Sequence, residues 1–482
     1  ANTDGINNTG IGSASLQKNT GGDYNTAIGV VSLLENTTGD NNAAIGYEAL
    51  RMNTSAFANS ALGSKALRNN TTGLYNTGTG YQALQLNTTG SYNVGVGLQA
   101  VGNNTTASYN TGVGAYALKE NTTGTNNVAV GYEALEQNTT ASSNTAVGYY
   151  ALTANTTGDQ ITAVGKDSML LNTTGRLSAA FGVAALYNHT TGLYNVGIGV
   201  QAGQGIRSGS YNTAVGAQTL YTSNTASNNT AVGYGVLFSS TVGDNTGVGY
   251  LALSSNTTGT FNTAVGTNAL DDNTTGGNNT AIGYQSLTAN TTGSDNTAVG
   301  MRSMQLTTTG IENTALGTSS LQNNTSGDSN TAIGRLALHQ NSTADNNTAV
   351  GRAALQLNTT GTSNTAIGAF ALDSNTTGNG NTAVGYNAVQ SNSIGNSLTA
   401  IGRDALFTNT TGSDNTALGR QTLYLNTTGS KNVAVGKAAL ESNSSASNNT
   451  AVGFEALKAN TTGTQNVAVG SLALDANTTG SQ

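Results

Sequence analysis

Residues 144–160 read NTAVGYYALTANTTGDQ, and this stretch recurs along the chain with a period of 17 residues. The glycine of its Ala-Val-Gly triplet, which we call the anchor glycine, has an equivalent every 17 residues from Gly12 to Gly233. After one step of 16 residues the series resumes at Gly249 and runs to Gly470, and all 28 anchor positions are glycine. A fixed period over a whole chain is typical of repeat proteins, in which each unit packs on its neighbours.

The single shorter step divides the repeats into two blocks, residues 1–243 and 244–482. The missing residue falls in a Gly-x-x-Asn link, and deletions are tolerated best in surface turns. No linker or change of composition accompanies it. The sequence therefore predicts one continuous repeat domain over residues 1–482.

Two columns of the repeat are apolar. The residue before the anchor glycine is Val, Ile, Leu or Phe in 27 of the 28 repeats, and we call this the aliphatic column. The fourth residue after the anchor is Leu, Met or Val in 27 repeats, and we call this the leucine column. The Thr-Ala-Val segment alternates, which places Thr and Val on one face of a short strand and Ala on the other.

The repeat predicts a β-solenoid. A unit of 17 residues is shorter than the about 33 residues of a helical-hairpin repeat. Its Gly, Asn and Thr are poor helix formers, and Asn-Thr-Thr-Gly is typical of turns. We therefore predict an all-β fold, a parallel β-solenoid (β-roll) of about 28 coils with 17 residues per coil. We expect two short strands in each coil, with the aliphatic and leucine columns in the core.

Apolar burial alone does not stabilise such a coil. Two large aliphatic side chains contribute roughly 2–3 kcal/mol each, whereas ordering each backbone residue costs about 1–2 kcal/mol. Hydrogen bonds between stacked Asn and Thr side chains are therefore expected in every coil. Packing of the small Ala/Gly face against a neighbouring chain would add to this, which favours a homo-oligomer, with a trimer as the first choice. Open strand edges at the solenoid ends leave end-to-end filaments as an alternative.

Composition excludes several classes of function. The chain has no cysteine, two histidines, and a net charge of −7. These features argue against disulfides, a zinc ribbon and nucleic-acid binding. No apolar run reaches the about 18 residues of a membrane span. His189 and His339 lie nine repeats apart and cannot share a metal or a proton. We expect no cofactor, no metal site and no catalytic residue.

The residues that directly follow the anchor glycines form a column that we call the outer row, and cations and tyrosines recur in it. Such a row suits an anionic polysaccharide or a neighbouring filament. Alternatively, it keeps the surface soluble or contacts acids of another chain, such as Asp295, Glu312, Asp328 and Asp345. The candidate contact residues are Arg335, Arg352, Arg403, Arg420, Lys437, Tyr81, Tyr132 and Tyr149.

Acidic residues follow two positions after some anchors. Glu133 and Asp167 are two repeats apart, a spacing near that of an inverting glycosidase pair. Nothing else in the sequence supports catalysis, so a solvated face is the better interpretation.

Asn-Thr-Thr matches the acceptor pattern for N-glycosylation, although turn propensity alone explains its recurrence. The candidate sites include Asn36, Asn87, Asn121, Asn155 and Asn256.

Two features of the repeat resemble known surface proteins. The Asn-Thr-Ala-Ile-Gly of residues 25–29 and the Asn-Thr-Ala-Val-Gly of residues 144–148 resemble the head repeats of YadA-type trimeric autotransporter adhesins. The full unit, for instance residues 127–143, is similar to repeat arrays of bacterial and phage tail-fibre-like surface proteins. This resemblance implies a left-handed β-roll, trimerisation and extracellular exposure. The unit is longer than the adhesin head repeat, and no coiled-coil stalk, membrane anchor or chaperone domain is present in these residues.

These observations predict a non-enzymatic extracellular structural fibre or filament subunit, a rigid rod on or from a cell surface. The alternative is an adhesin, or a receptor-binding protein of the phage tail-fibre type, that recognises glycans. The expected partners are further copies of the chain and surface glycans, without membrane insertion or nucleic acid.

Overall fold

The computed structural model describes residues 3–482, and they form short parallel strands joined by turns. The chain divides into two compact units, residues 1–243 and 244–482, and the boundary falls at the shorter step of the repeat. The strands of the first unit are β1 (Thr9–Ile11), β2 (Thr26–Ile28), β3 (Ala43–Ile45), β4 (Ser60–Leu62), β5 (Thr77–Thr79), β6 (Val94–Val96), β7 (Thr111–Val113), β8 (Val128–Val130), β9 (Thr145–Val147), β10 (Thr162–Val164), β11 (Ala179–Phe181), β12 (Val196–Ile198), β13 (Thr213–Val215) and β14 (Thr230–Tyr234). The strands of the second unit are β15 (Thr246–Tyr250), β16 (Thr263–Val265), β17 (Thr280–Ile282), β18 (Thr297–Val299), β19 (Thr314–Leu316), β20 (Thr331–Ile333), β21 (Thr348–Val350), β22 (Thr365–Ile367), β23 (Thr382–Val384), β24 (Thr399–Ile401), β25 (Thr416–Leu418), β26 (Val433–Val435), β27 (Thr450–Val452) and β28 (Val467–Val469).

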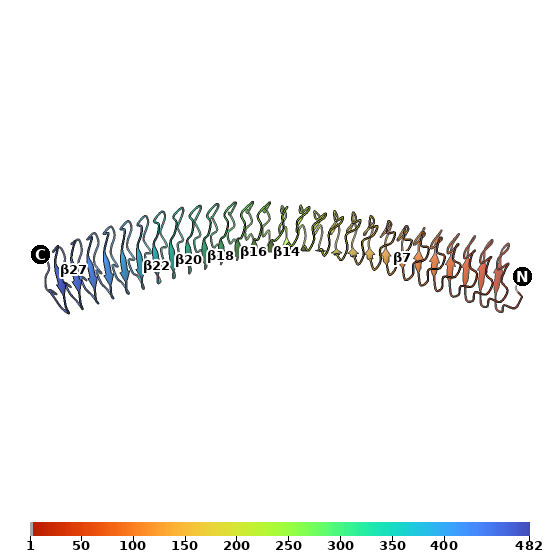
Figure 1. Cartoon of the computed structure of the whole chain (residues 1–482), viewed down its shortest axis with the longest axis horizontal. Helices are drawn as coiled ribbons and strands as arrows, with labels where there is room; N and C mark the ends of the chain where they lie inside the picture. Colours follow the sequence, from red (N-terminus) through yellow and green to blue (C-terminus); the bar gives the residue numbers. More distant parts are fainter. Residues whose placement is uncertain (1–2) are drawn as a thin grey trace. The chain divides into compact units, whose positions relative to one another are not determined.

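Within each unit, every strand pairs in parallel with the strand of the next repeat (Figure 1). The register follows the repeat, so that Thr263 lies opposite Thr280 and Val265 opposite Ile282. Backbone hydrogen bonds join successive coils outside the strands as well, for example from Leu270 N to Ser286 O at 3.1 Å. The predicted all-β parallel solenoid, with about 28 coils of 17 residues and no helix among residues 3–482, is confirmed.

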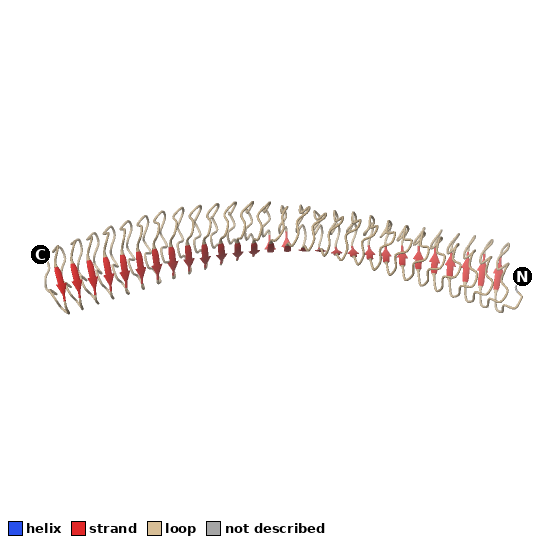
Figure 2. Ribbon diagram, viewed as in Figure 1, coloured by secondary structure: helices blue, strands red, loops and turns tan. Residues whose placement is uncertain are grey.

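Each coil contains one strand instead of the two that we predicted. The strand lies on one side of the coil, and turns form the rest (Figure 2). The leucine column is outside the strand because its backbone is left-handed, with φ of 52° at Leu270. A second left-handed residue stands two positions earlier, Asn268 with φ of 54°. Two left-handed residues this close turn the chain sharply and prevent a second extended strand, although backbone hydrogen bonds still join successive coils there.

The strand faces are the reverse of our expectation. Alanines between the Thr and the aliphatic residue, such as Ala264 and Ala281, are fully buried inside the coil. The aliphatic column points outward, and Ile282 is 40% exposed. The prediction that this column fills the core is wrong, and so is the prediction that the Ala/Gly face packs against a neighbouring chain. The interior is narrow, and the leucine column together with alanine and asparagine fills it.

Two ladders of buried asparagine run through the interior, as the stacking argument predicted. In the Asn-Thr-Thr-Gly turn, Asn273 Nδ2 donates to Asn256 Oδ1 of the previous coil at 2.7 Å and to Gly276 O at 3.0 Å. Before the strand, Asn279 N donates to Asn262 Oδ1 at 3.0 Å. These bonds satisfy polar groups that would be costly to bury unpaired.

Candidate contact surface

The period-two alternation of the strand continues beyond both of its ends. In the repeat around Gly351, the side chains at alternate positions point outward and the two between them are buried. The outward residues are Asn346, Thr348, Val350 and Arg352, and the buried residues are Asn347 and Ala349. Stacking of coils turns these positions into four parallel columns, which we call the outer face. It includes the outer row, so the candidate contact residues lie at one edge of this face.

The five candidate cations of the outer row are exposed: Arg335, Arg352, Arg403, Arg420 and Lys437. Arg403 Nε lies 3.0 Å from Asp404 Oδ2, which neutralises this cation locally. Arg352 lies 5.3 Å from the ring centre of Phe370, and Lys437 lies 5.2 Å from that of Phe454. Among residues 3–482, no ion pair involves Arg335, Arg352 or Arg420. Three guanidinium groups are therefore available to anions.

The three candidate tyrosines are about half exposed, at 48% for Tyr81, 39% for Tyr132 and 46% for Tyr149. The rings of Tyr132 and Tyr149 stack at 5.4 Å with an angle of 16° between their planes. Stacking therefore covers one face of each ring in this pair. Hydrogen bonding to Glu133 raises the pKa of Tyr132 to about 12, so this hydroxyl stays protonated at neutral pH.

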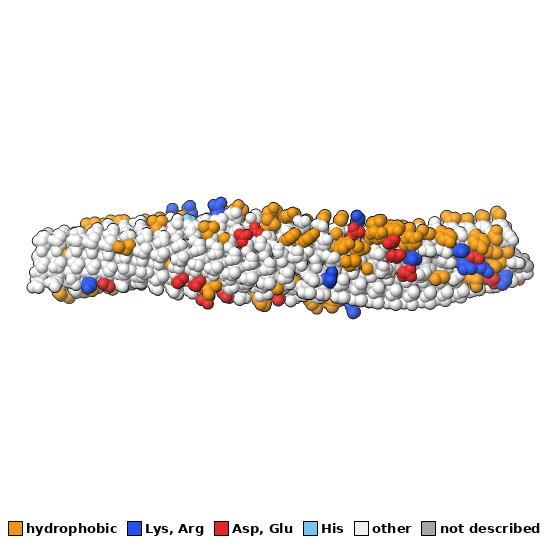
Figure 3. Space-filling view, turned by 90° about the horizontal axis from the view of Figure 1, so that it is seen from above, with side chains coloured by type: hydrophobic (Ala, Val, Ile, Leu, Met, Phe, Trp, Pro, Cys, Tyr) orange, Lys and Arg blue, Asp and Glu red, His pale blue; other side chains and the backbone are white. Residues whose placement is uncertain are grey.

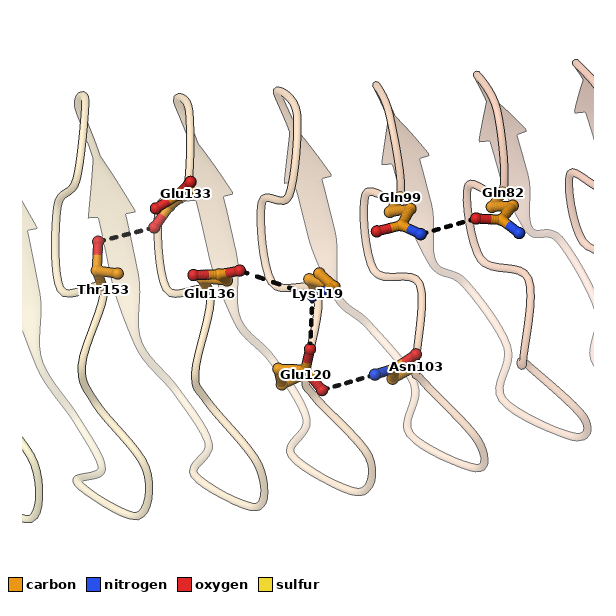
Figure 4. Close-up of polar contacts among 8 residues, drawn as sticks. All are labelled: Gln82, Gln99, Asn103, Lys119, Glu120, Glu133, Glu136 and Thr153. Carbon is orange, nitrogen blue, oxygen red and sulfur yellow. Dashed lines mark hydrogen bonds and ion pairs between the residues drawn. The ribbon is translucent and has the colours of Figure 1, made fainter.

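Figure 4 shows a cluster of charged and polar side chains on neighbouring coils of the first unit. Lys119 Nζ lies 2.9 Å from Glu120 Oε1 and 3.8 Å from Glu136 Oε1, and Asn103 Nδ2 donates to Glu120 Oε2 at 2.6 Å. The bond from Lys119 lowers the pKa of Glu120, whereas burial, followed by the charge of Glu133, raises the pKa of Glu136. The sequence argument missed this cluster. Comparing residues 17 positions apart, such as Lys119 with Glu136, would have found it.

Apolar and charged side chains also gather on one face of the first unit. Figure 3 shows, in the half toward the N-terminus, a band of apolar side chains with acidic and basic side chains beside it.

The Asp167 carboxylate lies 3.6 Å from Lys166 Nζ, so one of the two acids that we considered as a glycosidase pair, Glu133 and Asp167, has a cation beside it. Within residues 3–482, no group of three or more His, Asp or Glu side chains is placed to hold a metal ion.

The five candidate glycosylation sites are fully buried: Asn36, Asn87, Asn121, Asn155 and Asn256. Each side-chain amide takes part in the ladder of its turn. Asn87 Nδ2, for example, donates to Asn70 Oδ1 at 2.8 Å and to Gly90 O at 2.9 Å. A glycan on this nitrogen would require the coil to open and the amide to leave the ladder. The folded surface does not offer these amides for modification.

His189 replaces an asparagine in the same ladder and is fully buried. Its Nδ1 lies 2.8 Å from Asn172 Oδ1, and its Nε2 lies 3.1 Å from Asn195 Nδ2. Burial lowers the pKa of the imidazole to about 4. The ring therefore stays neutral in the folded chain at a pH at which an unfolded histidine is already protonated.

We expect the coils around His189 to lose stability as the pH falls from about 6.5 to about 4, because the unfolded chain then binds the extra proton. The full loss is about 3 kcal/mol and is reached below the pKa of the folded state. His189→Asn restores the repeat residue and should abolish this pH dependence. Hydrogen exchange of residues 172–195 at pH 7 and pH 4.5, in both proteins, measures the difference. Equal loss of protection at pH 4.5 in the two proteins would contradict the conclusion that the buried, neutral His189 causes the acid sensitivity.

Comparisons with protein-family models and with curated proteins find no match for this chain. A search of residues 3–482 finds no helix that is long and apolar enough to span a membrane.

Proposed function

We propose that this chain is a non-enzymatic structural subunit of an extracellular fibre, with left-handed coils and a homo-oligomeric assembly that spaces or connects surfaces. The observation that supports this role is the repetition of the interior bonds from coil to coil, although the side-chain ladder of the turn is interrupted at Ile206 and at Thr307. Asn290 Nδ2 donates to Asn273 Oδ1 at 2.7 Å, and Asn273 Nδ2 donates to Asn256 Oδ1 at the same distance. Such ladders, together with the backbone bonds between coils, resist bending and stretching along the stack.

Immunogold electron microscopy of the producing cells tests this role. We expect label on thin filaments outside the cell, and loss of these filaments when the gene is deleted. Label confined to the cell interior would contradict the proposal. Turnover of any polysaccharide by the purified chain would contradict the non-enzymatic part independently.

A second candidate role, glycan recognition by an adhesin or tail-fibre-type protein, is favoured by the exposed guanidinium groups of the outer row. Arg335, Arg352 and Arg420 have no carboxylate partner among residues 3–482, and they suit carboxylate or sulfate groups of a polysaccharide. A glycan array at physiological salt tests this role. Binding of acidic glycans that Arg335→Ala weakens would support it, and an array without binding would exclude glycan recognition by this chain.

A further inference from the structure

The outer face of the second unit, residues 244–482, has edges of opposite charge. The edge after the anchor glycines carries the five cations of the outer row. The opposite edge, five or six positions before the anchors, carries the acidic residues Asp295, Glu312, Asp328, Asp345 and Asp414. The side chains of both edges are exposed or half-buried. We call the two borders the basic edge and the acidic edge.

In three repeats, one coil carries a cation at one edge and a carboxylate at the other. Asp414 and Arg420 lie in the two outermost columns of the face. In the other two pairs, Asp328 with Arg335 and Asp345 with Arg352, the acid stands one position earlier, and its Oδ1 accepts a backbone N–H of the previous coil at 2.8 Å. The two members of a pair are separated by the extended strand, which puts their backbones about 20 Å apart. They cannot pair with each other, and among residues 3–482 no ion pair involves any of the six.

Between the two edges the outer face carries a threonine column and the aliphatic column side by side. The aliphatic column leaves Ile282 40%, Leu316 48%, Ile367 42% and Ile401 45% exposed. Strands spaced by about 4.8 Å over this unit give a face of about 60 Å by 20 Å, or about 1,200 Å². A stable interface needs roughly 800 Å² per partner, so the area of this face is sufficient for one.

We propose that this outer face is covered by the same face of a second copy of the chain, with the two stacks parallel and their coils in register. A two-fold axis along the stacking direction places the acidic edge of each coil opposite the basic edge of the same coil in the second copy. Asp414 then meets Arg420 of the second copy, and Arg420 meets its Asp414. Sheets pack face to face with strands nearly aligned, and β-branched side chains suit such a surface.

The opposite orientation is disfavoured by charge. If the two stacks ran antiparallel, the basic edge of one copy would lie along the basic edge of the other. In the parallel arrangement like charges meet in one coil, which carries Lys431 and Lys437 at its two edges. Solvent and salt screen this repulsion at an exposed edge. The proposal deepens the structural role proposed above, because it names the partner of the fibre subunit and the face that binds it.

Charge reversal at one pair tests the contact. We expect the full-length chain to dimerise in sedimentation equilibrium, and Arg420→Glu or Asp414→Lys to weaken the dimer about tenfold, or about 1.4 kcal/mol. The double variant Arg420→Glu/Asp414→Lys should restore association to near the wild-type value, which also shows that the singles remain folded. Asp414 has no side-chain hydrogen bond among the described residues, so its replacement leaves the coil intact. Arg207→Glu, an exposed charge on a turn of the first unit, is the matched control and should change nothing.

Cross-linking tests the orientation. The chain has no cysteine, so Thr263→Cys and Thr450→Cys each introduce a single thiol, near opposite ends of the outer face. With a short bismaleimide we expect each variant to cross-link with itself. Cross-linking only between the two variants would overturn the parallel arrangement. A wild-type chain that stays monomeric at high micromolar concentration would overturn the contact between two copies of the outer face. That result would not test the fibre role, which the immunogold experiment tests independently.

Discussion

Leu270→Asp is expected to unfold the coils around it and to lower the free energy of unfolding by more than about 4 kcal/mol. Leu270 is fully buried in the leucine column, and its own backbone bonds join two coils. The substitution removes about 2–3 kcal/mol of apolar burial and places a carboxylate at a fully buried position, which is costly for a charge without a partner. Urea denaturation followed by circular dichroism measures the loss, and hydrogen exchange locates it.

The matched control is Ile282→Asp in the aliphatic column of the next coil. Ile282 points outward and is 40% exposed, so the new carboxylate reaches water. We expect a loss of about 1 kcal/mol, which reflects the poor strand propensity of aspartate. Similar losses in the two variants would show that the aliphatic column is also part of the core and would contradict the burial described above.

Gly266→Ala is expected to cost at least about 3 kcal/mol, the second large effect. The anchor glycine has φ of 139°, a conformation that is open essentially to glycine alone. A Cβ atom there would lie 2.4 Å from Gly283 O and 2.7 Å from its carbonyl carbon in the next coil. Because backbone blocks the methyl group, two coils must separate to admit it. The melting temperature and the urea midpoint both measure this effect.

Gly259→Ala is the matched control because Gly259 is the turn glycine of the preceding repeat. Its Cβ would also approach backbone, at 2.2 Å from Gly276 O. The sequence nevertheless carries buried alanine at six equivalent positions, Ala56, Ala107, Ala141, Ala226, Ala344 and Ala446. We therefore expect a smaller loss than for Gly266→Ala. The reverse order would mean that crowding in the turn, rather than the backbone conformation of the anchor, limits the repeat.

The repeat period predicted most of the fold and part of the candidate surface. Residues 17 positions apart stack, as Asn256 and Asn273 do in the interior and as Lys119 and Glu136 do on the surface. The shorter step of the repeat coincides with the division into two compact units after residue 243, whereas the sequence predicted one continuous domain. The sequence predicted that the outer row faces outward, and it shows that Asp414 and Arg420 have opposite charges. The sequence did not show that these two residues border the same outward face.

The amino-acid sequence by itself determined the length of the coil, its register and the polar ladders, because one-dimensional periodicity becomes stacking when each unit packs only on its neighbours. Only the tertiary structure decided which strand face lies inside. The alternation of side chains along the Thr-Ala-Val strand places Thr and Val on one face and Ala on the other, but it does not determine which of these faces points to the interior. The choice depends on the cross-section of the closed coil. Left-handed turns such as Leu270 bring the leucine column, alanine and two asparagines together in a narrow interior, and the β-branched side chains are left facing outward.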